Sequence, residues 1–180
     1  PTNKHDTFDM PEMITAMSVR PSGDLLIASH HGINNFSFEK KELTKILDIE
    51  PDLPNNRCND GASDAKGRFW IGTMQNNISS EATDIPLTEN SGSLYCVDKD
   101  LSIKKHESNI GVSNTIAWSP DNKKFYFTDT LTGIISSYDF DLSNGTISNK
   151  KDFASHERGY PDGSTVDSEG FLWSCRWGGS

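Results

Sequence analysis

Cysteine is scarce in this chain. Its 180 residues include three cysteines, Cys58, Cys96 and Cys175. A small and odd number of cysteines cannot build a disulfide framework, so we expect a protein of the reducing cytoplasm. The chain begins at Pro1 and not at a methionine, so this expectation applies to the sequence as printed, in which no signal peptide is visible.

Positive charge is also in short supply. The 17 Lys and Arg residues are outnumbered by 26 Asp and Glu residues, which gives a formal net charge of −9. Pairs such as Lys40-Lys41 and Lys150-Lys151 are isolated in the sequence, and no longer basic run occurs. Nucleic acids and anionic membrane surfaces both require a basic patch, so we expect neither as a partner. No apolar run reaches the length of a membrane span.

Several catalytic motifs are missing. The chain has no G-x-S-x-G nucleophile elbow, no phosphate-binding loop, no dinucleotide fingerprint and no Cys/His pattern with zinc spacing. His30 and His31 are adjacent, and adjacent residues of a strand point to opposite faces, so we do not expect them to chelate one metal ion. These absences argue against serine-triad hydrolysis and nucleotide-dependent chemistry.

What is present is a series of short β-strand patterns. Runs rich in Ile, Val, Thr, Phe, Tyr and Trp are separated by turns rich in Gly, Asn, Asp and Pro, and no long segment has helical periodicity. Ala65-Lys66-Gly67 and Ser168-Glu169-Gly170 are typical turns, and Asn144-Gly145 is a strong signal for a two-residue hairpin loop. The sequence therefore predicts an all-β protein.

The turns recur with a period of roughly 45 to 55 residues, which is typical of propeller blades or kelch-like units. The predicted units cover residues 14–49, 59–107, 114–153 and 162–180, with a polar insertion at 76–90. In the first unit we expect strands near 15–19, 25–29, 32–37 and 45–49.

The last predicted unit contains barely two strands, so the chain does not hold a whole number of blades. We predict a β-propeller of four-stranded antiparallel blades, of which the single domain 1–180 holds about three and a half to four. We therefore expect the chain to be part of a longer propeller. A closed four-bladed ring and a β-sandwich are the alternatives. Trp70, Trp118 and Trp173 occupy related strand positions and are expected to pack between blades.

Three oxygen-bearing side chains share one phase of this repeat. Asn59, Asn114 and Asp162 each lie eight residues before the last residue of a predicted turn. Residues at one phase of a radial repeat lie at the same radius and on the same face, so we expect them to converge near the axis. Amide and carboxylate oxygens are ligands of hard divalent cations. The pattern predicts a cation site, although each residue taken singly is also explained as a turn or loop residue.

Longer motifs resemble those of a known family. Residues 57–61 and 67–74 are similar to the R-x-N-D-G…G-R-x-W-x-G-T-M signature of the SMP-30/gluconolactonase family. Residues 112–121 resemble its S-N-G-L-A-W-S-P-D segment, and residues 159–173 resemble its P-D-G…D-x-E-G-x-L-W segment. The resemblance covers most of the chain from about residue 15 onward. It implies a six-bladed propeller with a single divalent metal ion on its axis.

The resemblance also implies roles for individual residues. Asn114 and Asp162 match two protein ligands of the metal, and Asp162 also matches the proposed catalytic base. Arg57 and Asn59 match residues that contact the substrate. Asn77 falls near a further substrate-contacting position, which is acidic in the family.

The sequence departs from the family pattern in two places that concern the site. The third metal ligand of the family is a Glu in an E-G-P-x-W segment, and this chain has no such segment. Thr115 stands where a glycine usually follows the metal-binding Asn.

The activity implied by the resemblance is hydrolysis of a sugar lactone or a related cyclic ester. A metal held by amide and carboxylate oxygens polarises a lactone carbonyl, and a carboxylate beside it accepts a proton from the attacking water. Oxygen ligands suit Ca²⁺ first, and Mg²⁺, Mn²⁺ or Zn²⁺ as alternatives. Two other functions stay open: esterase or organophosphatase activity at the same site, and a non-catalytic propeller that binds calcium or a protein partner. The sequence gives no prediction of the oligomeric state.

Overall fold

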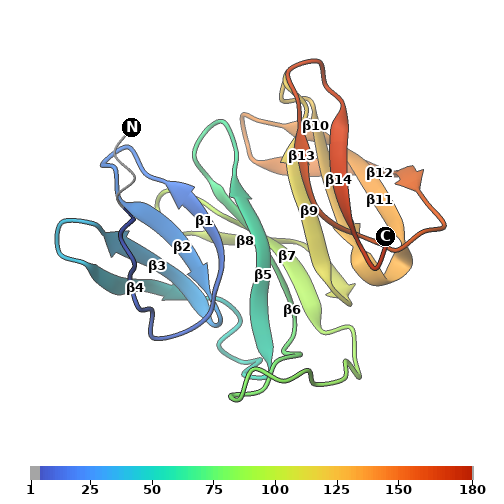
Figure 1. Cartoon of the computed structure of the whole chain (residues 1–180). Coiled ribbons are helices and arrows are strands. Elements are labelled where there is room, and N and C mark those ends of the chain that lie inside the picture. The colour runs from blue at the N-terminus through green and yellow to red at the C-terminus, as the bar shows by residue number, and fades with distance from the viewer. Residues whose placement is uncertain (1–4, 180) are drawn as a thin grey trace.

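The computed structural model describes residues 5–179, and strands dominate it (Figure 1). The first sheet contains β1 (Ile14–Val19), β2 (Leu25–Ser29), β3 (Gly32–Ser37) and β4 (Glu42–Asp48). The second contains β5 (Asn56–Ser63), β6 (Phe69–Gln75), β7 (Gly92–Val97) and β8 (Ile103–Ile110). The third contains β9 (Ser113–Trp118), β10 (Lys124–Asp129), β11 (Ile134–Asp141) and β12 (Thr146–Ser155), with the 3₁₀ helix η1 (Thr130–Thr132) after β10. The fourth pairs β13 (Tyr160–Val166) with β14 (Leu172–Trp177).

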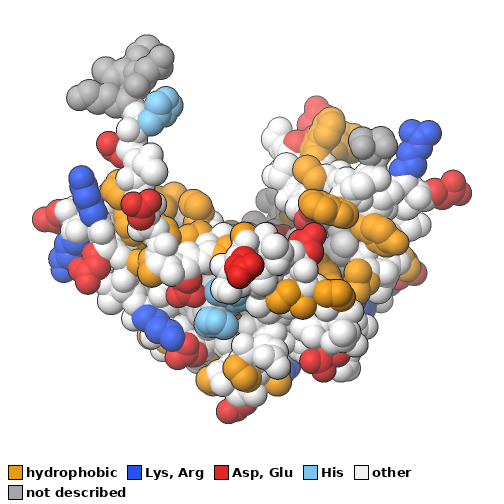
Figure 2. All heavy atoms as spheres, turned by 60° about the horizontal axis from the view of Figure 1, so that its bottom comes forward, with side chains coloured by type: hydrophobic (Ala, Val, Ile, Leu, Met, Phe, Trp, Pro, Cys, Tyr) orange, Lys and Arg blue, Asp and Glu red, His pale blue; other side chains and the backbone are white. Residues whose placement is uncertain are grey.

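Each sheet is an antiparallel meander whose strands keep the order of the sequence. The first strand of each sheet contacts the first strand of the next, so that β1, β5, β9 and β13 form the inner side of an arc (Figure 1). In the space-filling view the described residues form two arms with an open notch between them (Figure 2). Consecutive four-stranded meanders arranged in this way confirm the all-β propeller prediction.

Apolar side chains fill the spaces between neighbouring sheets. Ile33, Phe69 and Ile71 belong to a cluster between the first and second sheets. Trp70 and Phe125 belong to a larger cluster between the second and third sheets. Full burial of one such side chain contributes about 1.5–3 kcal/mol, so these interfaces fix the relative positions of the inner strands.

The expected packing role of the tryptophans is fulfilled in two of three cases. Trp70 is fully buried, and Trp118 packs against the same cluster. Trp173 is 65% exposed, so the prediction is wrong for this residue within residues 5–179. The reason is that β14 belongs to a two-stranded sheet, and no further sheet lies over that side of it in the described chain.

Two local predictions also differ from the structure. Asn144 and Gly145 end a four-residue loop, residues 142–145, and do not form a two-residue hairpin loop by themselves. His30 and His31 lie in the turn between β2 and β3, where the alternation of strand side chains does not apply, and their rings stack with centroids 4.6 Å apart. Among the described residues there is no helix with the length and apolar character of a membrane span.

Candidate functional site

The residues predicted to form the site lie on three neighbouring inner strands. Arg57 and Asn59 are on β5, Asn114 is on β9 and Asp162 is on β13. Because these strands contact one another in sequence, residues that are far apart in the chain come together on the inner side of the arc. Asn77 follows β6, the partner strand of β5, and lies at the start of the polar insertion.

Each of these strands carries an irregularity at the predicted position. The register of β5 shifts between Cys58 and Gly61, and that of β13 shifts between Pro161 and Ser164. On β9 the segment between Asn114 and Ala117 is one residue longer than the facing segment of β10. β-Bulges of this kind re-aim a side chain out of the regular alternation and are common beside active sites. The shared phase seen in the sequence therefore corresponds to a recurring bulge on the inner strands.

Arg57 connects the first part of the site. Its buried guanidinium donates through Nε and Nη2 to Asn77 Oδ1, at 3.1 and 2.8 Å. Nη1 donates to Asn59 Oδ1 at 2.8 Å and to the Cys58 carbonyl at 2.9 Å. Burial lowers the pKa of Arg57, yet a guanidinium stays charged at any physiological pH. Four of its five N–H groups are thereby occupied, which leaves one on Nη2 for a ligand.

Asn59 links β5 to β9. Its Nδ2 donates to the Ser113 carbonyl at 2.8 Å and lies 3.4 Å from Asn114 Oδ1. Its Oδ1 accepts from Arg57, as described above. The structure thus brings Asn59 and Asn114 into contact, but both ends of the Asn59 amide already have protein partners.

Asn114 and Asp162 are connected through threonine hydroxyls. Asn114 Nδ2 donates to Thr130 Oγ1 at 2.9 Å, and this hydroxyl donates to the Pro161 carbonyl at 2.8 Å. Thr115 Oγ1 donates to the Asp162 carbonyl at 2.6 Å. Within residues 5–179 the side-chain carboxylate of Asp162 accepts no hydrogen bond.

Asp60 is a second carboxylate beside Asp162. It accepts hydrogen bonds from the backbone N–H groups of Gly61, at 2.9 Å, and Ile116, at 3.2 Å. Burial raises the pKa of Asp60, the nearby charge of Asp162 adds to this effect, and the two N–H donors oppose it. Because its oxygens already bind the backbone of β5 and β9, Asp60 holds these strands together next to the site.

The donor set fits a hard divalent cation. Thr130 binds the Nδ2 of Asn114, so that Oδ1 is the acceptor end of this amide and has only the 3.4 Å contact with Asn59 Nδ2, and the Asp162 carboxylate has no protein donor among the described residues. One amide and one carboxylate oxygen are typical cation ligands. No group of three or more His, Cys, Asp and Glu side chains suited to a metal occurs in the described part of the chain. The candidate ligand set therefore combines the amide oxygen of Asn114 with the carboxylate of Asp162.

Sequence reasoning missed the two threonines that tie the site together. Thr130 follows β10 and carries no motif or phase that marks it. Thr115 was visible only as a replacement for glycine. In the structure its backbone φ is +58°, a left-handed conformation that glycine adopts readily and that is unusual for a β-branched residue.

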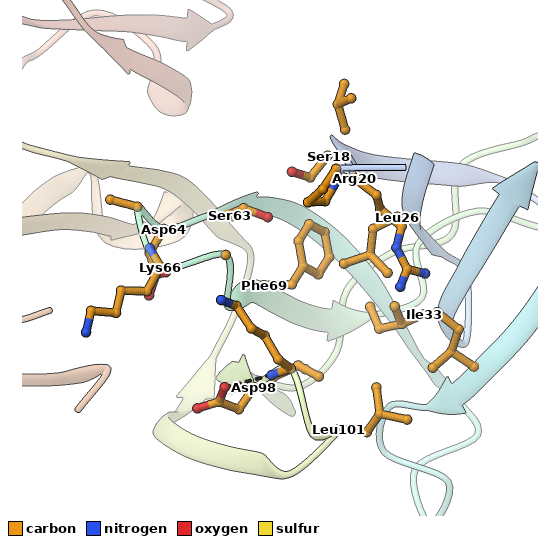
Figure 3. A pocket seen from close by; sticks show the side chains of 17 residues that line it. Ser18, Arg20, Leu26, Ile33, Ser63, Asp64, Lys66, Phe69, Asp98 and Leu101 are labelled. Carbon is orange, nitrogen blue, oxygen red and sulfur yellow. Dashed lines mark hydrogen bonds between the residues drawn. The ribbon is translucent and has the colours of Figure 1, made fainter. Parts of the chain in front are cut away.

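A separate cavity of about 660 Å³ lies between the first and second sheets (Figure 3). Its lining includes Arg20, Leu26, Ser63, Phe69 and Leu101. Ser63 ends β5, whereas Arg57 and Asn59 lie nearer its start, and none of the predicted site residues lines the cavity. The candidate chemistry therefore belongs to the inner strands and not to this groove.

The meander sheets define a β-propeller, and the polar cluster on their inner strands is its candidate site. The family described as the SMP-30/Gluconolactonase/LRE-like region matches residues 1–180, and the chain belongs to this family. Regucalcin of Xenopus laevis is 33% identical over 181 residues, covering 99% of this chain and 59% of the relative. Regucalcin of Gallus gallus is 34% identical over 169 residues, covering 92% and 55%.

Solved structures agree with this assignment. A luciferin-regenerating enzyme aligns with a TM-score of 0.83 and 33% identity, covering 96% of this chain and 58% of that one. A regucalcin from Agrobacterium tumefaciens, described as a calcium-binding protein, aligns with a TM-score of 0.83 and 32% identity, covering 94% and 55%. A gluconolactonase from Xanthomonas campestris shares the fold, with a TM-score of 0.75 at 21% identity. The chain thus spans less than two thirds of the length of these relatives.

Proposed function

We propose that the intact protein hydrolyses a sugar lactone or a related cyclic ester with one divalent cation, Ca²⁺ being the expected ion. The observation that carries this proposal is the contact network from Arg57 through Asn59 and Asn114 to the Asp162 segment. Family membership supports it, because gluconolactonases give the family part of its name.

Asn114 Oδ1 and the Asp162 carboxylate would hold the ion, together with ligands that the described residues do not supply. A bound cation at this place would stabilise the negative charge that develops on a lactone carbonyl oxygen. The free N–H of Arg57 Nη2 binds an oxygen of the substrate, and Asn59 and Asn77 hold the guanidinium in place. These contacts orient the substrate before the reaction.

Asp162 has a second task in this proposal. Its carboxylate accepts the proton of a water molecule that attacks the lactone carbonyl carbon. The bond between that carbon and the ring oxygen breaks, and the ring oxygen leaves as a hydroxyl after it takes up the proton that Asp162 received from the water. The product is the open hydroxy acid, and no oxidant or reductant is consumed.

The test is hydrolysis of an aldonolactone by the intact protein, with and without a chelator, and in the variant Asp162→Asn. We expect chelation to abolish turnover, added Ca²⁺ to restore it, and the variant to lose about a hundredfold or more in kcat/KM. The matched control is Asp167→Asn, which alters a turn carboxylate five residues away. Full activity after thorough chelation would overturn the cation-dependent mechanism.

Assays with other substrates and a measurement of calcium binding separate the alternatives. Hydrolysis of simple esters or organophosphates in preference to lactones would assign a different substrate to the same residues. Tight calcium binding without turnover of any of these substrates would favour a non-catalytic calcium-binding propeller. A cytoplasmic location stays our prediction from the cysteine content.

A further inference from the structure

Two threonine hydroxyls of the third sheet bind consecutive carbonyl groups of the fourth. Thr130 Oγ1 donates to the Pro161 carbonyl at 2.8 Å, and Thr115 Oγ1 donates to the Asp162 carbonyl at 2.6 Å. Both threonines are buried, with exposed fractions of 8% and 0%. Loss of the Thr130 hydroxyl would be costly, because the Pro161 carbonyl that it binds is buried and would be left without a partner. Thr115 and Thr130, here called the threonine clamp, thus hold the segment that presents Asp162.

Thr130 also controls Asn114. Its hydroxyl oxygen accepts the Asn114 Nδ2 hydrogen bond while its proton goes to Pro161. A single hydroxyl therefore sets the rotation of the Asn114 amide and the position of the residue before Asp162. The helix η1 that carries Thr130 is itself fixed, since Asp129 Oδ1 accepts the Leu131 N–H at 3.1 Å and the Val112 N–H at 3.0 Å.

Thr115 has a strained backbone conformation, and its side chain contacts β13. A β-branched residue with φ of +58° persists only where its surroundings impose that conformation. Its hydroxyl binds Asp162 and also lies 2.8 Å from Ser164 Oγ, so it contacts both sides of the β13 bulge. A glycine would relax the backbone but would remove both contacts.

We propose that the threonine clamp positions the two cation ligands relative to each other, by fixing Asn114 on β9 and Asp162 on β13. The clamp residues touch neither the ion nor the substrate in this proposal, which rests on the proposed function above. The clamp links the third sheet to the fourth. These two sheets also pack against each other through a small apolar cluster around Tyr126 and Ile135.

The test compares Thr115→Val and Thr130→Val, which keep the side-chain shape but lose the hydroxyl, with Thr115→Ser and Thr130→Ser, which keep it. Calorimetry with CaCl₂ on the intact protein measures the affinity, and thermal unfolding without calcium measures stability. We expect each Val variant to lose about tenfold or more in calcium affinity, while the Ser variants stay within about threefold of wild type.

The matched control is Thr128→Val. Thr128 is equally buried, and its hydroxyl donates to the Ile134 carbonyl at 2.6 Å within the third sheet. Its loss is expected to lower the thermal midpoint and to leave calcium affinity unchanged, which separates positioning from general stability.

The outcomes distinguish the two proposals. Calcium binding by wild type that the Val variants retain unchanged would overturn the clamp alone. An equal loss of affinity in Thr128→Val would overturn it as well. Absence of calcium binding by the wild-type protein would overturn the proposed function and the role of the clamp with it.

Discussion

Arg57 and Asn77, twenty residues apart in sequence, are joined by two hydrogen bonds to one amide oxygen, at 3.1 and 2.8 Å. The planar guanidinium presents Nε and Nη2 on one edge, and Asn77 Oδ1 lies opposite that edge. Asn77 stands at the beginning of the polar insertion, so this loop takes part in the site through the orientation of Arg57.

Replacement of Asn77 tests that role. We expect Asn77→Ala to raise KM for a lactone about tenfold with little change in kcat, because Arg57 loses the partner that fixes its plane. Asn77→Asp keeps an acceptor oxygen at the same place and is expected to stay close to wild type. Steady-state kinetics on the intact protein measure both, and an unchanged KM in Asn77→Ala would contradict the assignment.

Replacement of Gly72 is predicted to destabilise the protein, because the second and third sheets meet at its Cα. A Cβ atom at this position would lie 2.3 Å from Ser113 Oγ and 2.4 Å from Ser113 Cβ, which is far inside van der Waals contact. Gly72→Ala must push β9 away from β6, at a cost of about 1–3 kcal/mol. Because Ser113 precedes Asn114, calcium affinity should fall as well.

The control for this change is Gly163→Ala. A Cβ atom at Gly163 would meet nothing within 4 Å, so we expect a change in stability of no more than about 0.5 kcal/mol. Chemical denaturation of both variants provides the comparison. Equal stability of Gly72→Ala and wild type would show that the sheets can separate at this point without cost.

Asp64 and Arg68 form a buried ion pair in the turn between β5 and β6, and Arg68 connects this turn to the third sheet. Asp64 accepts from Arg68 Nε at 2.7 Å and from Trp70 Nε1 at 3.2 Å, and Arg68 Nη2 donates to the Leu142 carbonyl at 2.6 Å. Asp64→Asn leaves the buried guanidinium without a counter-charge, so we expect a loss of about 3–5 kcal/mol in the free energy of unfolding.

The turn at Asp167 offers a matched comparison for Asp64. Asp167 accepts a hydrogen bond from Trp173 Nε1 at 2.8 Å in the same arrangement, but Asp167 is only partly buried and Trp173 is exposed to solvent. Asp167→Asn should therefore cost much less than Asp64→Asn in this chain, as measured by urea denaturation. A small loss in Asp64→Asn would contradict the importance of the buried pair.

His106 should make stability depend on pH. Its ring stacks on Trp70 with centroids 4.7 Å apart, and burial, with a smaller effect from Lys104, lowers the pKa of His106 from 6.5 to about 4. Between these two values the unfolded chain binds a proton that the folded protein does not. The contribution of neutral His106 is therefore complete above pH 6.5 and is lost as the pH falls toward 4.

We expect this loss to be about 1–2 kcal/mol, allowing for the partial exposure of the ring. His106→Phe keeps an aromatic ring on Trp70 and removes the titrating group, so it should flatten stability between pH 6.5 and 4. Urea denaturation at several pH values measures the slope. The same slope in the variant and in wild type would assign the pH dependence to other groups.

Much of the fold could be predicted because its signals are local. The predicted strands at residues 25–29 and 32–37 match β2 and β3. The loop of β11 and β12 was predicted too short, because Asp141 binds the Ser143 N–H with its side chain and the Gly145 N–H with its carbonyl, which stabilises a four-residue turn. Such side-chain capping competes with the two-residue geometry that Asn-Gly favours.

The site was predictable only in part, for a different physical reason. A shared phase placed Asn59 beside Asn114, because a repeat converts sequence spacing into radial position. The partner that orients Asn114 is Thr130, which lies outside that phase and meets it through the fold of β10. Thr115 gave a signal only through its departure from glycine, which by itself does not reveal what its hydroxyl binds.

The paired arrangement of turn aspartate and tryptophan has a wider consequence. The same hydrogen bond from a tryptophan Nε1 to a turn aspartate forms at Trp70, which is fully buried, and at Trp173, which is 65% exposed among the described residues. Its geometry is therefore encoded within each hairpin and does not depend on a neighbour. Because the turn needs only residues of its own hairpin, it is preserved when a blade is copied by gene duplication.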